Sequence, residues 1–239
     1  MDFENSLKEF GIELNQIQKD RFEEYFRLLV EWNEKMNLTA ITDRDEVYVK
    51  HFLDSLSFIK VNPAKEDFTL LDVGTGAGFP GIPIKILYPN AKITLMDSLQ
   101  KRITFLNEVV NALHLNDDGS ITAVHARAED LAKEKVHREQ YDYVVSRAVA
   151  NLSTLSEYCL PFVKVGGAFV SFKSEKATEE LKDAKKAIYL LGGEFREEIA
   201  FTLPDSDFKR TLLVIEKKTP TSAKYPRKAG MPAKNPLGQ

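Results

Sequence analysis

The chain has 239 residues, of which 43% are hydrophobic and 29% are charged, so it can form one large domain with a small addition, or two small domains. No stretch approaches the roughly 20 apolar residues that span a bilayer, and the acidic residues near the N-terminus argue against a signal peptide. The single cysteine, Cys159, excludes an intrachain disulfide, and the four histidines have no metal-ligand spacing. We therefore expect a cytoplasmic protein with no metal site and no membrane partner.

The net charge of −3 conceals an asymmetry along the chain. Residues 1–70 hold 9 Lys/Arg and 15 Asp/Glu, whereas residues 217–239 hold six Lys/Arg and no acid. A basic tail that contains prolines and a tyrosine on an otherwise acidic protein is typical of a contact with a polyanion, although a solvated tail would have a similar composition.

Residues 1–62 are expected to form a helical N-terminal region. Asn15 can cap a helix, with Gln18 three positions later, and apolar residues then recur at three- and four-residue spacing. A second helix is expected to start near Thr42. It presents His51, Asp54 and Ser55 on one face, as an Asp-oriented histidine base or as a hydrogen-bonded group that ties the helix to the core.

A strand at about 68–73 ends in a glycine-rich loop, which contains Gly74, Gly76 and Gly78. A strand, a glycine-rich turn and a helix together form a cradle for a nucleotide-like ligand, because glycines let backbone N–H groups approach it. A literal dinucleotide G-x-G-x-x-G pattern starts at Gly76, but counted from the strand end the sixth position is Phe79. The loop therefore leaves open whether the ligand is a dinucleotide or S-adenosylmethionine (SAM).

Strands and helices alternate beyond this loop. Strands are expected at about 91–97, 120–126, 141–146, 167–173, 194–203 and 210–217, and helices at about 80–88, 98–114, 129–137, 151–163 and 175–191. This alternation predicts an α/β fold with a mostly parallel sheet. The last two strands are joined too closely for a crossover helix, so they should be antiparallel. A seven-stranded sheet of this kind favours a class I SAM methyltransferase over a dinucleotide oxidoreductase, which should repeat a second parallel half.

Polar residues follow the expected strands at the edge where such sheets bind ligands. Asp97 ends the second strand and can accept the hydroxyl hydrogens of an adenosine ribose. Ala128-Glu129 follows the third strand, Arg147 the fourth and Lys173 the fifth. Their convergence predicts a binding site.

Several motifs together resemble one family. The motifs are Asn37-Leu38-Thr39, His51-x-x-Asp54-Ser55, Asp72-Val-Gly-Thr-Gly-Ala-Gly-Phe-Pro-Gly81, Asp97-Ser98-x-x-Lys101-Arg102, Arg127-Ala128-Glu129, Ser146-Arg147-Ala148 and Lys224-Tyr-Pro-Arg-Lys. They are similar, nearly end to end, to the RsmG (GidB) family of bacterial 16S ribosomal RNA guanine-N7 methyltransferases. The resemblance implies a Rossmann-like class I core with SAM at Gly74, Gly76, Gly78, Phe79, Asp97, Ala128, Glu129 and Arg147.

The resemblance also implies 16S ribosomal RNA or the small ribosomal subunit as the partner. The N7 atom of guanine keeps a lone pair at neutral pH, so no catalytic base is needed. A lysine or arginine that holds O6 would position the base, and the candidates are Lys173 and Arg147. His51 and Ser55 are weaker candidates for the substrate side. The residues expected to bind RNA are Lys101, Arg102, Lys224, Arg227 and Lys228.

We thus predict a helical region at 1–62, a SAM-binding core at 63–218 and a basic tail at 219–239 that contacts RNA. We see no assembly motif and expect a monomer. The competing functions are an NAD-dependent oxidoreductase, a SAM methyltransferase acting on a small molecule or protein, and a non-catalytic RNA-binding module. The sequence leaves open which guanine is modified, and whether the substrate is naked RNA, an assembly intermediate or the mature subunit.

Overall fold

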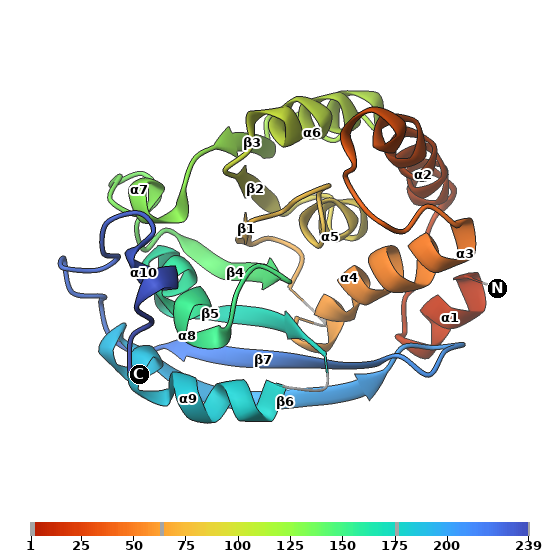
Figure 1. Ribbon diagram of the computed structural model, residues 1–239. Helices are drawn as coiled ribbons and strands as arrows, with labels where there is room; N and C mark the ends of the chain where they lie inside the picture. Colours follow the sequence, from red (N-terminus) through yellow and green to blue (C-terminus); the bar gives the residue numbers. More distant parts are fainter. Residues whose placement is uncertain (1–2, 63–64, 175–176, 239) are drawn as a thin grey trace.

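The computed structural model describes residues 3–62, 65–174 and 177–238, which form a seven-stranded sheet between two layers of helices (Figure 1). The strands are β1 (Thr69–Val73), β2 (Lys92–Asp97), β3 (Ile121–His125), β4 (Tyr141–Arg147), β5 (Val163–Lys173), β6 (Gly193–Thr202) and β7 (Lys209–Lys217). Their order in the sheet is β3-β2-β1-β4-β5-β7-β6. The first five strands pair in parallel, and β7 is antiparallel to both β5 and β6. The predicted mostly parallel sheet with a terminal antiparallel pair is confirmed.

Each face of the sheet has its own hydrophobic core. The helices are α1 (Phe3–Glu9), α2 (Gln16–Met36), α3 (Arg44–Val47), α4 (Asp54–Leu56), α5 (Gly81–Leu87), α6 (Gln100–Ala112), α7 (Ala128–Leu131), α8 (Leu152–Cys159), α9 (Ala177–Leu190) and α10 (Met231–Lys234). The N-terminal helices, α5 and α6 pack on one face, whereas α7, α8 and α9 pack on the other (Figure 1). No helix of the described residues is long and apolar enough to cross a membrane.

The helical N-terminal region covers the glycine-rich loop. Helix α2 begins at the predicted capping box, in which Asn15 and Gln18 bond to each other's backbone N–H. The fully buried Tyr25 of this helix donates its hydroxyl to Ala77 O at 2.5 Å, so the helix is fixed directly to the loop. The predicted second helix starts after the N-cap Asp43, but it changes to a π-helical stretch, η1 (Tyr48–Leu53), and ends in a 3₁₀ turn, η2 (Ser57–Lys60).

Two expected elements differ in length. The helix predicted at 129–137 is only the four-residue α7 followed by turns, because the segment after it has no apolar face to bury: Val136 is 73% exposed. Strand β5 starts at Val163, where the helix predicted to reach 163 has already ended at Cys159 and passed into a 3₁₀ turn, η3 (Leu160–Phe162). The predicted domain boundary at 62/63 and the predicted helix start at 175 touch positions outside the described residues.

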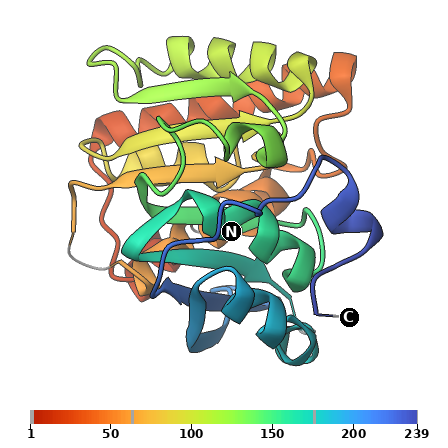
Figure 2. The same cartoon turned by 90° about the vertical axis from the view of Figure 1, so that its left-hand side faces the viewer.

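The C-terminal segment beyond β7 packs against the folded core. In Figure 2 it runs across the outside of the helices next to β4 and β5, forms α10 and continues beyond it. Helix α10 contacts α8. The basic tail is therefore a docked segment rather than a solvated one.

Candidate functional site

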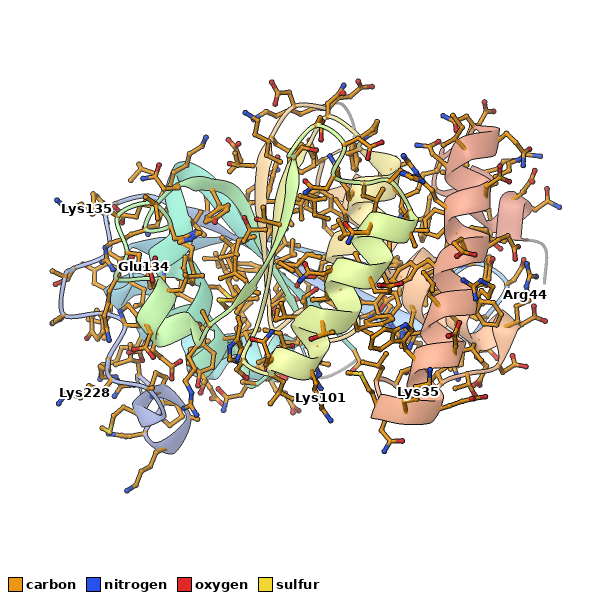
Figure 3. All side chains as sticks on the ribbon, turned by 90° about the horizontal axis from the view of Figure 1, so that it is seen from above. Lys35, Arg44, Lys101, Glu134, Lys135 and Lys228 are labelled. Carbon is orange, nitrogen blue, oxygen red and sulfur yellow. The ribbon has the colours of Figure 1, made fainter. Side chains whose placement is uncertain are left out.

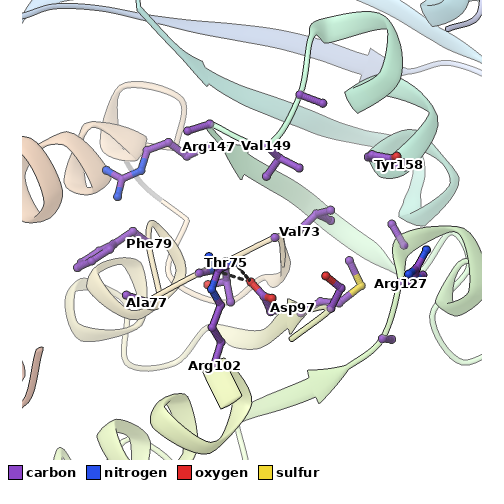
Figure 4. A pocket seen from close by; sticks show the side chains of 18 of the residues that line it. Val73, Thr75, Ala77, Phe79, Asp97, Arg102, Arg127, Arg147, Val149 and Tyr158 are labelled. Carbon is purple, nitrogen blue, oxygen red and sulfur yellow. Dashed lines mark hydrogen bonds and ion pairs between the residues drawn. The ribbon is translucent and has the colours of Figure 1, made fainter. Parts of the chain in front are cut away.

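A cavity of about 680 Å³ lies at the carboxyl ends of β1 to β4 (Figure 4). It is lined by the loops that follow these strands, by Leu38, Thr39 and His51 from the N-terminal region, and by Gly230 and Ala233 from the tail. The strands are parallel here, so their carboxyl ends meet at one edge and bring distant motifs together. Among the predicted SAM-binding residues, the cavity is lined by Gly74, Gly76, Phe79, Asp97, Ala128, Glu129 and Arg147.

The glycines of the loop differ in what surrounds them. Gly74, Gly76 and Gly78 all have positive φ, at 72°, 63° and 99°. A Cβ on Gly76 would meet no atom within 4 Å, whereas a Cβ on Gly78 would lie 2.5 Å from Ile82 Cδ1 and 2.6 Å from the Tyr25 hydroxyl. Gly76 therefore leaves room for a ligand, while Gly78 allows close packing under α2 and does not line the cavity.

Asp97 connects the loop after β1 to the end of β2. Its carboxylate is 2% exposed; Oδ2 accepts from the Gly76 N–H at 3.0 Å and from Arg102 Nη1 at 3.1 Å, and Oδ1 accepts from the Leu99 N–H at 2.9 Å. A carboxylate can accept about four hydrogen bonds in total, so a ligand hydroxyl can still be bound. The assignment of Asp97 to a ribose stays a prediction.

The side chain of Asp72 stabilises the glycine-rich loop through hydrogen bonds, a role that the sequence motif did not reveal. Its side chain is fully buried, and Oδ2 accepts from the Thr75 hydroxyl at 2.6 Å and from the Gly81 N–H at 2.8 Å. Within the described residues Oδ1 has no hydrogen-bond partner. Burial raises the pKa of this carboxyl to about 7, so its charge is sensitive to pH near neutrality.

Arg147 forms a wall of the cavity together with Phe79. Its guanidinium lies 5.1 Å from the centre of the Phe79 ring, and its Nη1 lies 2.8 Å from Oδ2 of the buried Asp54. The other oxygen of Asp54 accepts from Arg210 Nε at 3.0 Å. Asp54 therefore holds two arginines and does not orient His51.

His51 is a neutral packing and hydrogen-bonding group. Its ring stacks on Phe79 with centroids 4.6 Å apart, and its Nε2 lies 2.9 Å from Thr39 Oγ1. Burial, with Arg147 nearby, lowers its pKa to about 3, so the ring is uncharged at neutral pH. These contacts favour a group that ties the helix to the core over an Asp-oriented base. Ser55 is fully buried, donates its hydroxyl to His51 O, and does not line this cavity, so its placement on the substrate side stays a prediction.

A second cavity of about 690 Å³ adjoins the first and shares with it His51, Arg147 and residues 148–150. Lys173 lines this second cavity, not the first. Its Nζ donates to Glu180 Oε2 at 2.7 Å and to Ala150 O at 2.9 Å. The two cavities are thus neighbours across the loop that follows β4.

The predicted RNA-binding residues divide into two groups. The side chains of Lys101, Lys224 and Lys228 are exposed, and Figure 3 shows Lys101 and Lys228 on the outside of the molecule. Arg102 instead pairs with Asp97 and lines the first cavity. Arg227 pairs with Glu157, which is completely buried, so its guanidinium is committed to the fold. Both arginines therefore make ion pairs within the chain, and their placement at RNA phosphates stays a prediction.

In the described parts of the chain, no group of three or more His, Cys, Asp or Glu side chains could hold a metal ion. Sequence reasoning missed Gly230 and Ala233 as part of the cavity, and nothing in the local sequence of the tail marks them. It also missed Tyr158 of α8, which lines the same cavity.

The sheet order, the glycine-rich loop after β1 and the acid at the end of β2 define a class I methyltransferase fold. The model of the family described as GidB, rRNA small subunit methyltransferase G, matches residues 18–211. The chain is 54% identical to ribosomal RNA small subunit methyltransferase G of Lachnoclostridium phytofermentans, over 98% of this chain and 96% of that protein. The protein of the same name from Alkaliphilus metalliredigens is 52% identical over 99% and 98%. The chain belongs to the rRNA small subunit methyltransferase G family.

Solved structures share the fold at low sequence identity. TYW2 from P. horikoshii in complex with MeSAdo aligns with a TM-score of 0.53 and 18% identity, over 69% of this chain and 61% of that one. TYW2 from M. jannaschii in complex with AdoMet aligns with a TM-score of 0.51 and 15% identity, over 69% and 76%. Family membership and the antiparallel β7 decide against the NAD-dependent oxidoreductase.

Proposed function

We propose that this protein transfers a methyl group from SAM to N7 of a guanine in small-subunit (16S) ribosomal RNA. The observation that carries the proposal is the pair of adjoining cavities that share His51 and Arg147. A group-transfer enzyme needs its donor and acceptor in contact, and two cavities that meet at one wall satisfy that requirement. The names of the relatives given above indicate that the RNA is that of the small ribosomal subunit.

The first cavity fits the methyl donor. Gly76 leaves open the space that its missing Cβ would fill, Asp97 presents a buried carboxylate for the ribose, and Glu129 presents another where the resemblance expects the adenine. When bound, SAM supplies a methyl group activated by the sulfonium. The loop glycines and Phe79 then hold its methionine end, and Arg147 closes the wall toward the acceptor.

The second cavity suits the guanine. Lys173 and Arg147 offer N–H donors for O6, and Glu180 offers an acceptor for the N–H groups on the opposite edge of the base. The Lys173–Glu180 pair keeps both groups in place before RNA binds. With O6 held, N7 can face the shared wall.

Catalysis by this chain is mainly alignment. N7 carries a lone pair at neutral pH, so no residue has to remove a proton. The low pKa of His51 agrees with this, because a neutral, stacked imidazole adds no positive charge beside the donor. Correct positioning of two reactants can lower the activation free energy by roughly 7–11 kcal/mol.

The RNA is expected to be unpaired at the target, because the N7 edge of an A-form helix lies in a deep, narrow groove. The exposed Lys101, Lys224 and Lys228 supply phosphate contacts, so RNA affinity falls as salt rises. The protein acts as a monomer in the bacterial cytoplasm, where ribosomal RNA is made.

Incubation with radiolabelled SAM and small-subunit particles from a strain that lacks the enzyme tests the proposal. Label should appear in 16S RNA as 7-methylguanosine on nucleoside mapping. Label in protein or in small molecules, or no label in RNA, would overturn the assignment. Lys173→Met should raise the KM for particles with little change in the Kd for SAM. Lys135→Met, at an exposed lysine that lines neither cavity, serves as the control.

A further inference from the structure

The tail, residues 219–238, is anchored to the core by two arginines and a buried glutamate. Arg227 pairs with Glu157 of α8 through Nη2–Oε2 at 2.7 Å and Nε–Oε1 at 3.0 Å. Arg138 donates to Thr221 O at 2.8 Å and to Tyr225 O at 3.0 Å. We call this docked segment the strap.

The inner side of the strap reaches the donor cavity. Gly230 and Ala233 line it together with Glu129 and Tyr158. The Gly230 N–H donates to Glu129 Oε1 at 2.8 Å, across 101 positions of sequence. Beside this contact, Thr154 of α8 donates its hydroxyl to Pro232 O at 3.1 Å. The strap therefore holds one of the two carboxylates that face the cavity.

We propose that the strap is part of the donor site, and that Gly230 acts as a positioning residue for Glu129. This inference rests on the proposed function, and it assigns the wall at the adenosine end of the donor to residues 230–233. The Gly230 N–H binds Oε1, and the remaining acceptor positions of the carboxylate can meet an N–H or O–H of the bound adenosine. The Arg227–Glu157 pair is what seats the strap against α8.

A carboxylate held by a backbone N–H keeps one orientation, because it loses a hydrogen bond if it rotates away. Glu129 is 5% exposed whereas Gly230 is exposed, so this part-buried bond links a buried carboxylate to the surface of the strap. Gly230 has φ of 82°, a conformation that favours glycine, and a Cβ there would meet no atom within 4 Å. The position thus combines a left-handed backbone with an N–H that points at the cavity wall.

The test is calorimetric binding of S-adenosylhomocysteine, which occupies the donor site without reacting, to full-length variants. Arg227→Met combined with Glu157→Gln releases the strap without leaving a buried charge unpaired. It should weaken Kd at least tenfold while the circular dichroism spectrum is retained. Lys234→Gln, which removes an exposed cation of the same segment, is the matched control and should bind as the wild type does. A folded double variant with the wild-type Kd would overturn the inference.

Hydrogen exchange in the wild-type protein provides a readout that needs no variant. S-adenosylhomocysteine should slow amide exchange in residues 227–234, and unchanged exchange there on saturation would also refute the role of the strap. If the wild-type protein did not bind S-adenosylhomocysteine at all, the proposed function would fail instead. The two failures are therefore distinguishable.

Discussion

Replacing Gly76 and Gly78 separately by alanine should separate an effect on ligand affinity from an effect on the stability of the fold. Both residues lie in the loop after β1 and both have positive φ. Only Gly76 faces open space, whereas a Cβ on Gly78 would lie within 2.6 Å of Ile82 and of the Tyr25 hydroxyl. Gly76→Ala should therefore impair donor binding, and Gly78→Ala should impair stability.

The magnitudes follow from these surroundings. A left-handed alanine costs about 1 kcal/mol, which lowers Tm by about 2–4 °C in a protein of this size. Gly78→Ala adds overpacking of about 2 kcal/mol, for a total Tm loss of about 6–12 °C. In Gly76→Ala, the methyl group occupies ligand space, and we expect at least a tenfold weaker Kd, which is about 1.4 kcal/mol.

The assay combines calorimetry with S-adenosylhomocysteine and thermal unfolding followed by circular dichroism. Gly76→Ala should show a small Tm loss with a large loss of affinity, and Gly78→Ala the larger Tm loss. An unchanged Kd for Gly76→Ala would refute the placement of the donor against the loop. A Tm for Gly76→Ala lower than that of Gly78→Ala would refute the packing argument.

Three other changes have defined outcomes. Burial raises the pKa of Asp72 to about 7 from an ordinary value near 4, so between these pH values the folded protein binds a proton that the unfolded chain releases, and the free energy of unfolding falls as pH rises from about 4 to 7. Asp72→Asn should therefore flatten the profile of Tm against pH between about pH 4 and 7. Parallel profiles of the variant and the wild type would contradict the raised pKa. Asp54→Ala leaves Arg147 and Arg210 without their shared carboxylate and should lower the free energy of unfolding, measured by urea titration, by about 3 kcal/mol. A loss below about 1 kcal/mol would show that these ion pairs contribute little to stability. Lys101→Ala should weaken binding to small-subunit RNA and reduce the slope of log K against log salt concentration by about one unit. An unchanged slope in filter-binding assays would show that Lys101 does not contact the RNA.

Much of the site was accessible from sequence because it obeys a topological rule. Apolar runs mark the parallel strands, and ligands bind beyond their carboxyl ends. Gly74, Asp97, Glu129 and Arg147 each follow such a run, and the structure brings all four to one cavity. Lys173 follows the same rule but lines the neighbouring cavity, since β5 lies one strand further from β1.

Other roles depended on what each side chain meets. Gly78 and Gly76 are equivalent in the pattern, yet one lies under Tyr25 and the other faces the cavity. Ser55 shares a predicted helix face with His51, but it bonds within its own helix. Arg227 belongs to a basic cluster, but a buried carboxylate 70 positions away binds it.

The sequence by itself determined the alternation of strands and helices, the capping box of α2 and the glycine-rich loop after β1, because these depend on periodicity and on neighbours within a few residues. Only the tertiary structure decided that β7 enters between β5 and β6, and that the basic tail turns back to meet Glu129. Such pairings join residues far apart in the chain, and they are chosen by complementary shape, charge and hydrogen bonding in the folded protein, which leave no local signature.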